Sequence, residues 1–273
     1  MSGPVALVTG ASSGIGLCFA QQLAQQGYDL VLVARRVERL EKIAADLTQK
    51  HSIDCRVEGR DLADPRAVSE LVADLERDSV EVEVLINNAG YGLSGAYLSQ
   101  PWEQHEQFIR VLLTAVCELT HRLLPGMKQR GKGRIIQVSS VAGFLPGTAG
   151  HTLYGAVKAA LNLFSECLAL ECQGSGVHVT SLCPGFTYTE FHDVTGTREK
   201  MSKMPGFLWL QADRVAREAL KACDKGKIYC VPGLVYKSVL FILWLIPAPL
   251  RRWLVARQGS SYRDSSETPV KTP

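Results

Sequence analysis

Short apolar runs alternate with longer amphipathic stretches along most of the chain. The apolar runs are rich in Val, Ile and Leu and are bounded by turn residues, as strands are: 5–9, 29–34, 55–60, 82–87, 134–139, 178–183 and 227–231. The stretches between them have helical spacing: 15–26, 37–51, 65–77, 102–130, 153–173 and 212–224. Pro65 suits a first helical turn, with Asp64 as the N-cap. This alternation predicts an α/β fold with a parallel sheet that helices cover on both faces.

Composition bounds the class of protein. The chain has 273 residues, of which 46% are hydrophobic and 21% charged, so it can bury a full core and is not disordered throughout. The net charge of +3 is too small and dispersed to indicate nucleic-acid binding. We expect one domain over residues 1–258, with an apolar extension at 233–258. A disordered tail, rich in Ser, Thr and Pro, is expected at 259–273.

Cysteines and apolar runs bear on location. The eight cysteines are scattered without a C-x-x-C pair, which favours reduced thiols in a cytoplasmic protein over a metal site. The N-terminus leads into an apolar strand without the features of a signal peptide. The unbroken apolar run at 239–246 ends at Pro247 and is far shorter than the roughly 18–20 residues of a membrane span.

A glycine-rich loop, Thr9–Gly16, joins the first expected strand to the first helix. Glycines in this context permit a tight turn, let backbone amides approach a pyrophosphate, and allow close helix packing. The helix N-terminus then favours anions. We therefore expect a dinucleotide phosphate site at Gly10, Ser12, Ser13, Gly14, Ile15 and Gly16. The alternative is a tight turn without a ligand.

The end of the second expected strand bears on cofactor choice. An acidic residue is expected there if the adenosine ribose has a free 2′-hydroxyl, but the residue is Ala34. Arg35 and Arg36 follow, and guanidinium groups match a phosphate. This favours NADP(H) over NAD(H). The alternative is that both arginines are solvated charges at a helix start.

Tyr154 and Lys158 stand one helical turn apart, on one helix face. A free tyrosine has a pKa near 10, and a nearby ammonium lowers it toward the range useful for acid–base chemistry. Ser140 closes an upstream strand, where its hydroxyl can steady a substrate carbonyl. A tyrosine–lysine pair of this spacing is common, and alone it would favour an ordinary surface pair.

Together these residues resemble the short-chain dehydrogenase/reductase family over about residues 5–232. The resemblance rests on Thr9–Gly16, Asp61-Leu62, Asn87-Asn88-Ala89-Gly90, Ser140, Tyr154–Lys158 and Pro184-Gly185 with Thr189. It implies a Rossmann-type, doubly wound parallel sheet of about seven strands with helices on both faces. It also implies hydride transfer between a nicotinamide and a ketone or alcohol.

The resemblance assigns roles to single residues. Tyr154 matches the proton donor in reduction, Lys158 the residue that lowers its pKa and bonds the nicotinamide ribose, and Ser140 the group that polarises the carbonyl. Tyr154 and Lys158 thus count as cofactor contacts too. Further cofactor contacts are implied at Asp61, Leu62, Asn88, Ala89, Gly90, Pro184, Gly185, Thr187 and Thr189.

Two departures from the family pattern stand out. Leu112 occupies the position of an asparagine that helps hold a water beside the lysine, and Thr114 is a conceivable substitute. Ser140 lies fourteen residues before Tyr154, one more than is usual, in a loop that includes His151. These departures leave open a second interpretation, a catalytically weak dinucleotide-binding or sensor protein.

Apolar side chains gather where the family binds its substrate. The segment at about 186–210 and the loop after Gly90 contribute Phe191, Met201, Met204, Phe207, Leu208, Trp209, Leu210, Tyr91, Leu93 and Tyr97. They predict a lipophilic substrate, such as a 3-oxoacyl, steroid-like or retinoid-like compound, unless they pack into the core.

The apolar segment Gly233–Arg257, with four cations, fits either contact with a membrane surface, or a dimer interface or pocket cover. Family members are commonly dimers or tetramers, so we expect a homodimer or homotetramer.

Overall fold

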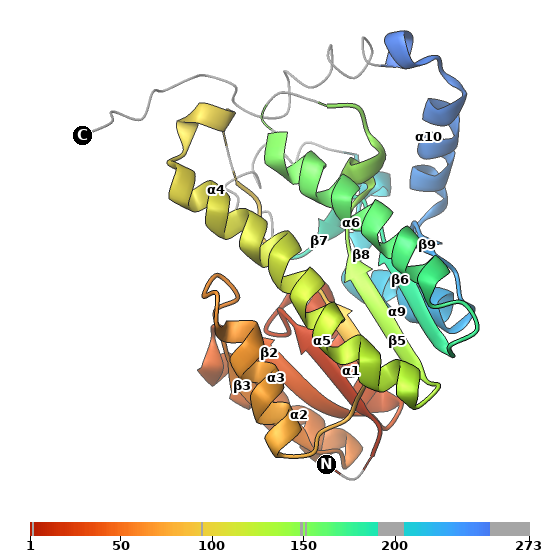
Figure 1. Cartoon of the computed structure of the whole chain (residues 1–273). Coiled ribbons are helices and arrows are strands. Elements are labelled where there is room, and N and C mark those ends of the chain that lie inside the picture. The colour runs from red at the N-terminus through yellow and green to blue at the C-terminus, as the bar shows by residue number, and fades with distance from the viewer. Residues whose placement is uncertain (2, 94, 148–149, 151, 191–204, 252–273) are drawn as a thin grey trace.

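The computed structural model describes residues 1–273 apart from 2, 94, 148–149, 151, 191–204 and 252–273. Its central sheet has seven parallel strands in the order β3-β2-β1-β4-β5-β6-β9 (Figure 1). These are β1 Val5–Thr9, β2 Asp29–Ala34, β3 Cys55–Gly59, β4 Val82–Asn87, β5 Gly133–Val138, β6 Val177–Leu182 and β9 Tyr229–Cys230. The strand order reverses between β1 and β4, which confirms the expected doubly wound, Rossmann-type fold.

Helices cover both faces of the sheet, as the strand–helix alternation predicts. One face carries α1 Gly14–Gln25, α2 Val37–His51 and α9 Ala212–Asp224. The other carries α3 Ala67–Arg77, α4 Trp102–Ile109, α5 Ala115–Gln129 and α6 Thr152–Glu171. Alternate residues of one strand supply the two cores: Ala6 and Val8 face the first set, and Val5 and Leu7 the second. All four are almost wholly buried.

Two helix predictions were wrong in detail. Helix α3 begins at Ala67 rather than at Pro65, since a turn precedes it, in which Asp64 accepts the Arg66 amide through its side chain (2.8 Å) and the Ala67 amide through its carbonyl (3.1 Å). The expected helix over 102–130 is interrupted by a π-helical turn, η2 Arg110–Thr114, between α4 and α5. Other ends differ by one or two residues, the usual uncertainty of helix and strand ends.

Several small elements were not predicted. Strands β7 Thr187–Tyr188 and β8 Leu210–Gln211 pair in parallel, apart from the main sheet. The 3-10 helices are η1 Tyr97–Ser99, η3 Val141–Phe144 and η4 Gly206–Leu208. Within the apolar extension, α10 Leu234–Leu245 stands at the edge of the molecule (Figure 1). The expected tail at 259–273 lies outside the described residues.

Helix α6 has the length and mean composition that a membrane span requires. The criterion of an unbroken apolar run did not indicate this, because Lys158 and Glu166 interrupt the helix. In the structure α6 packs on β6 and η3, and it buries Lys158, Asn162 and Ser165 against them. That packing is typical of a helix covering a sheet.

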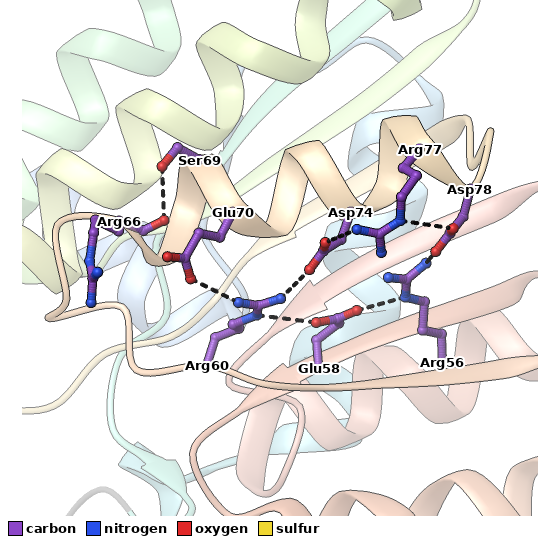
Figure 2. Close-up of polar contacts among 9 residues, drawn as sticks. All are labelled: Arg56, Glu58, Arg60, Arg66, Ser69, Glu70, Asp74, Arg77 and Asp78. Carbon is purple, nitrogen blue, oxygen red and sulfur yellow. Dashed lines mark hydrogen bonds and ion pairs between the residues drawn. The ribbon is translucent and has the colours of Figure 1, made fainter.

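Charged residues join β3 to α3 (Figure 2). Glu58 is buried and accepts from Arg56 (2.6 Å) and Arg60 (3.2 Å), which share its face of the strand. The two arginines also reach one face of α3, at Glu70, Asp74 and Asp78. We call these six residues the β3–α3 charge ladder. It fixes the end of β3, from which Asp61 and Leu62 follow.

Candidate active site

Three glycines shape the loop between β1 and α1. Gly10 and Gly14 have positive φ angles of 67° and 58°, which other residues rarely adopt. A Cβ atom at Gly16 would lie 2.3 Å from the Gly10 carbonyl oxygen, so α1 can approach its own loop only with glycine there. The loop thus brings its backbone to the N-terminus of a twelve-residue helix, where an anionic pyrophosphate is favoured.

The segment after β4 holds this loop in place. Asn88 donates through its side chain to the carbonyls of Thr9 (2.9 Å) and Gly10 (3.2 Å). The Thr9 hydroxyl accepts from the backbone amides of Asn88 (2.9 Å) and Ala89 (3.0 Å). Asn87 points elsewhere and donates to Thr120 (3.2 Å). The Asn88 side chain therefore shapes the phosphate loop.

Arg36 lies over the serines of the loop. Its guanidinium donates to the hydroxyls of Ser12 and Ser13, each at 3.0 Å. It also pairs with Glu190 (3.1 Å), which Arg39 contacts at 2.7 Å. Hydrogen bonds from Arg39 and Arg36 lower the pKa of the Glu190 carboxyl. The structure thus brings Arg36, Ser12 and Ser13 together, and it adds Glu190, which the sequence analysis missed.

The other residues expected around the adenosine differ in exposure. Arg35 and Asp61 are exposed, and both act electrostatically on Tyr91, whose pKa is raised mainly by burial. Leu62 is buried in the core, so its side chain packs within the protein. Tyr91 meets Phe108 edge-on, with ring centroids 5.5 Å apart. Tyr91 is thus partly buried against the core, and it is not among the residues that line the pocket beside Tyr154.

Ser140 follows the end of β5, and Tyr154 and Lys158 lie in the first turns of α6, which packs on η3 directly after Ser140. The Ser140 hydroxyl accepts from the Ala142 amide (3.1 Å) and lies 3.5 Å from the Pro184 carbonyl. The neighbouring Ser139 hydroxyl donates to the Lys158 carbonyl (2.9 Å), which ties the end of β5 to α6. The Lys158 ammonium lies 5.7 Å from the centroid of the Tyr154 ring.

Lys158 is buried, and its ammonium donates to the Val138 carbonyl at 2.8 Å. Loss of hydration disfavours the charged form and lowers the pKa of Lys158 to about 8. At neutral pH the ammonium remains the major form. A cation is thus held beside the phenol of Tyr154, in a site with little water to screen it.

Leu112 sits in the π-helical turn and is almost wholly buried. It lies against Gly90, where an added Cβ would be 3.5 Å from the leucine side chain. Thr114, the conceivable substitute for the missing asparagine, is exposed on the same turn. Thr114 therefore does not take over the buried position.

A pocket opens next to Tyr154, lined by Leu93, Tyr97, Gln100, His105, Thr152 and Leu153 among others. Leu93 and Tyr97 were expected there, whereas His105 was missed. The His105 ring stacks on Tyr97, with centroids 4.8 Å apart, and its Nε2 lies 2.7 Å from the Tyr97 carbonyl oxygen. A carbonyl only accepts, so Nε2 carries the proton. The buried Nδ1 has no partner among the described residues and is an acceptor in this tautomer.

The segment expected to cover the substrate is only partly described. Phe191, Met201, Met204 and the loop residue His151 lie outside the described residues. Trp209 stacks on Tyr188, with centroids 4.6 Å apart, and Leu210 is buried in the core. Phe207 is exposed. These three side chains thus do not line the pocket beside Tyr154.

The segment after β6 connects the two halves of the site. The Pro184 carbonyl accepts from the Val141 amide (3.1 Å), next to Ser140. Thr187 is buried and donates to the Gly185 carbonyl (3.0 Å). Thr189 reaches the phosphate loop, because a Cβ on Gly14 would lie 3.0 Å from its methyl group. The expected site residues therefore gather at the carboxyl ends of parallel strands, around the reversal of strand order.

Comparison with known proteins identifies relatives of this chain. Residues 4–200 match the family model described as short chain dehydrogenase. Serine 3-dehydrogenase of Rhizobium radiobacter is 37% identical over 205 residues, covering 74% of this chain and 79% of that protein. The very-long-chain 3-oxoacyl-CoA reductase of Homo sapiens is 32% identical over 192 residues, covering 69% of this chain and 61% of that protein.

A solved structure extends the likeness beyond the matched sequence. A short-chain dehydrogenase from Sphingobium yanoikuyae in complex with NADPH has a TM-score of 0.78 and 32% identity, covering 90% of this chain and 97% of that one. The family match exceeds half of this chain, and the relatives carry oxidoreductase names. The chain therefore belongs to the short-chain dehydrogenase/reductase family and is an NAD(P)-dependent oxidoreductase of CH–OH and C=O groups.

Proposed function

We propose that the protein uses NADP(H) to interconvert a lipophilic ketone and its alcohol. The observation that carries the proposal is the buried Lys158 ammonium, which lies 5.7 Å from the centroid of the Tyr154 ring and bonds the end of β5, two residues before Ser140. The glycine-rich loop fits a pyrophosphate, because side chains at Gly10 or Gly16 would fill the space beside its backbone. A bound reduced nicotinamide would supply the hydride that adds to the carbonyl carbon.

In this proposal, each of the three side chains has its own role at the carbonyl oxygen of the substrate. Ser140 hydrogen-bonds this oxygen and holds it toward Tyr154. Tyr154 donates its phenolic proton as the oxygen gains negative charge, and in alcohol oxidation it accepts the proton back. Lys158 stabilises the phenolate through its buried ammonium, which lies one helical turn away. In this scheme Lys158 also bonds the ribose of the cofactor.

A tyrosine substitution tests this chemistry. We expect Tyr154→Phe to lower kcat by at least about a hundredfold on a panel of ketones and aldehydes, while NADPH affinity is kept. Tyr28→Phe is the matched control, because Tyr28 bonds Glu83 at 2.7 Å, away from the site. Its kcat should equal that of the wild type. Unchanged turnover in Tyr154→Phe would overturn the mechanism.

The preference for NADP(H) is supported by Arg36 and its two serine partners. Ala34 supplies no carboxylate to bind a free 2′-hydroxyl, and Arg36 lies within 3.0 Å of the Ser12 and Ser13 hydroxyls. The relative from Sphingobium yanoikuyae was solved with NADPH. We expect kcat/KM to be higher with NADPH than with NADH, and Arg36→Ala to remove most of the difference. Equal kcat/KM values for both cofactors in the wild type would contradict the preference.

The substrate class rests on the walls of the pocket. Leu93, Leu153 and the ring of Tyr97 give it apolar sides, and Gln100 adds a polar amide. Among the related proteins are the 3-oxoacyl-CoA reductase and a 7beta-hydroxysteroid dehydrogenase (25% identity, TM-score 0.81). We favour a lipophilic substrate of the 3-oxoacyl, steroid-like or retinoid-like kind. Higher kcat/KM on a sugar ketone than on long-chain or cyclic ketones would refute this choice.

Leu112 supports a second candidate, a dinucleotide-binding protein with little turnover. Its buried side chain cannot hydrogen-bond a water beside Lys158. Tight NADPH binding without turnover on any ketone or aldehyde of the panel would favour this candidate. Turnover that depends on Tyr154 would favour the enzyme.

Assembly and location belong to the same proposal. We expect a homodimer or homotetramer, supported by Leu163 and Leu170, which α6 exposes on its outer side. Light scattering of the full chain measures this, and a monomer would refute it.

A cytoplasmic location is supported by the eight cysteines, all of which are free thiols. Cell fractionation measures the location.

A further inference from the structure

Helix α10 presents an apolar surface to the outside of the molecule. Trp244 is 74% exposed and Leu234 76% exposed. We define the α10 surface as Leu234, Val239, Phe241, Ile242, Trp244 and Leu245, all exposed. In a folded monomer, apolar exposure this dense marks a site of contact with another molecule or a membrane.

Tyr236 attaches the first turn of α10 to the body of the protein. Tyr236 is buried and its ring covers Gly185, where an added Cβ would lie 1.9 Å from a ring carbon. The Tyr236 hydroxyl accepts from the Phe186 amide (2.9 Å) and donates to the Leu208 carbonyl (2.6 Å). The helix also packs on η3, directly after Ser140. The apolar surface is therefore the outer side of an anchored helix.

The charges in the sequence on either side of this helix have one sign. Residues 225–263 contain seven lysines and arginines and no aspartate or glutamate. The chain has 30 basic and 27 acidic residues, so the remainder holds 23 basic against 27 acidic. The small net charge is thus the sum of a positive charge on residues 225–263 and a slightly negative charge on the rest of the chain. Lys237 is exposed on α10 itself.

We infer that α10 docks in the surface of an anionic lipid bilayer. Its apolar side chains would enter the boundary between headgroups and acyl chains, and Lys237 with the other basic residues of 225–263 would meet the headgroups. The helix has twelve residues, about 18 Å at 1.5 Å each, and is too short to cross the roughly 30 Å hydrocarbon core. It therefore lies in the interface rather than spanning the bilayer.

A second copy of the chain fits the same surface less well. In a two-fold interface each copy contributes the same patch, so two basic segments would face each other and repel. An anionic bilayer attracts both the apolar and the cationic parts of the segment. The inference does not depend on the reaction that the protein catalyses.

Vesicle sedimentation of the full chain tests the inference. We expect binding to vesicles of equal parts phosphatidylcholine and phosphatidylglycerol, and much weaker binding to phosphatidylcholine alone. The double variant Phe241→Ser, Trp244→Ser should lower binding by at least about tenfold. Lys237→Gln should lower it by about fivefold, as loss of one basic residue near a charged surface predicts.

The matched control is Val37→Ser with Leu98→Ser, which removes two exposed apolar residues from α2 and η1 instead. It should bind vesicles like the wild type. Circular dichroism verifies that each variant is folded. The inference is overturned if the wild type stays in the supernatant with the mixed vesicles, or binds both kinds equally. It is also overturned if the α10 variant turns an oligomer into a monomer while vesicle binding is absent throughout.

Discussion

Burial of Lys158 predicts a trade between stability and function at this residue. The pKa of Lys158 is about 8 in the folded protein, against 10.5 for a free lysine side chain. Because burial disfavours the protonated lysine, this difference lowers the free energy of unfolding by about 3 kcal/mol at neutral pH. Lys158→Met should remove that cost. It also removes the hydrogen bond to the Val138 carbonyl, which offsets about 1 kcal/mol.

The net expectation is that Lys158→Met is more stable than the wild type by about 2 kcal/mol near pH 7. The sign of the pH dependence follows from the depressed pKa. Between the folded and unfolded values the unfolded chain binds more protons, so the wild type gains stability as pH rises from about 8 toward 10.5. The advantage of the variant should therefore shrink by about 2 kcal/mol between pH 7 and pH 9.5.

Urea unfolding followed by tryptophan fluorescence measures both quantities, without cofactor and at two pH values. Lys42→Met is the matched control, since Lys42 is exposed on α2 and should show no such pH-dependent difference. NADPH-dependent turnover of Lys158→Met should be lost. The reasoning is refuted if Lys158→Met is less stable than the wild type near pH 7, or if its advantage is equal at both pH values.

Three further variants probe the surroundings of the site. Gly16→Ala should weaken NADPH binding at least tenfold and cost about 2 kcal/mol of stability, because its Cβ would lie 2.3 Å from the Gly10 carbonyl oxygen. Calorimetric titration and urea unfolding measure this, and wild-type affinity would contradict it. Glu190→Gln should tighten NADPH binding by about two- to fivefold and leave NADH unchanged, since Arg36 and Arg39 lose a competing carboxylate. Equal effects on both cofactors would argue against a phosphate contact. His105→Phe should keep the stacking on Tyr97 but lose the hydrogen bond to its carbonyl, and so lower stability by about 1 kcal/mol. Thermal unfolding checks this, and an unchanged melting temperature would exclude the bond as a stabilising contact.

The parts of the fold that follow local rules could be predicted from the sequence. Strands β1, β2 and β4 and helices α2 and α9 have the expected ends, because each is bounded by turn residues or a change of periodicity. The π-helical turn at Arg110–Thr114 could not be predicted in this way. Apolar spacing continues across it, and the extra residue in the turn shows only in backbone hydrogen bonding.

The candidate site likewise contains residues that could be predicted from local sequence and residues that could not. Its glycines and the Tyr154–Lys158 pair act through local conformation or helical spacing, which the sequence displays. Glu190 and His105 depend on contacts between distant segments: Glu190 reaches Arg36 across 154 positions, and His105 meets a carbonyl in η1. The aromatic composition around Trp209 predicted a wall of the substrate pocket, but the Trp209 ring stacks on Tyr188 instead.

The β3–α3 charge ladder has a consequence for solubility. Strand β3 is an outermost strand of the sheet, so one row of its backbone groups lacks a partner strand within the sheet. Charged side chains along such a strand discourage another chain from adding to it. At the opposite border, β9 is only two residues long and offers little backbone to pair with. Both borders of the sheet thus carry features that discourage the addition of another strand.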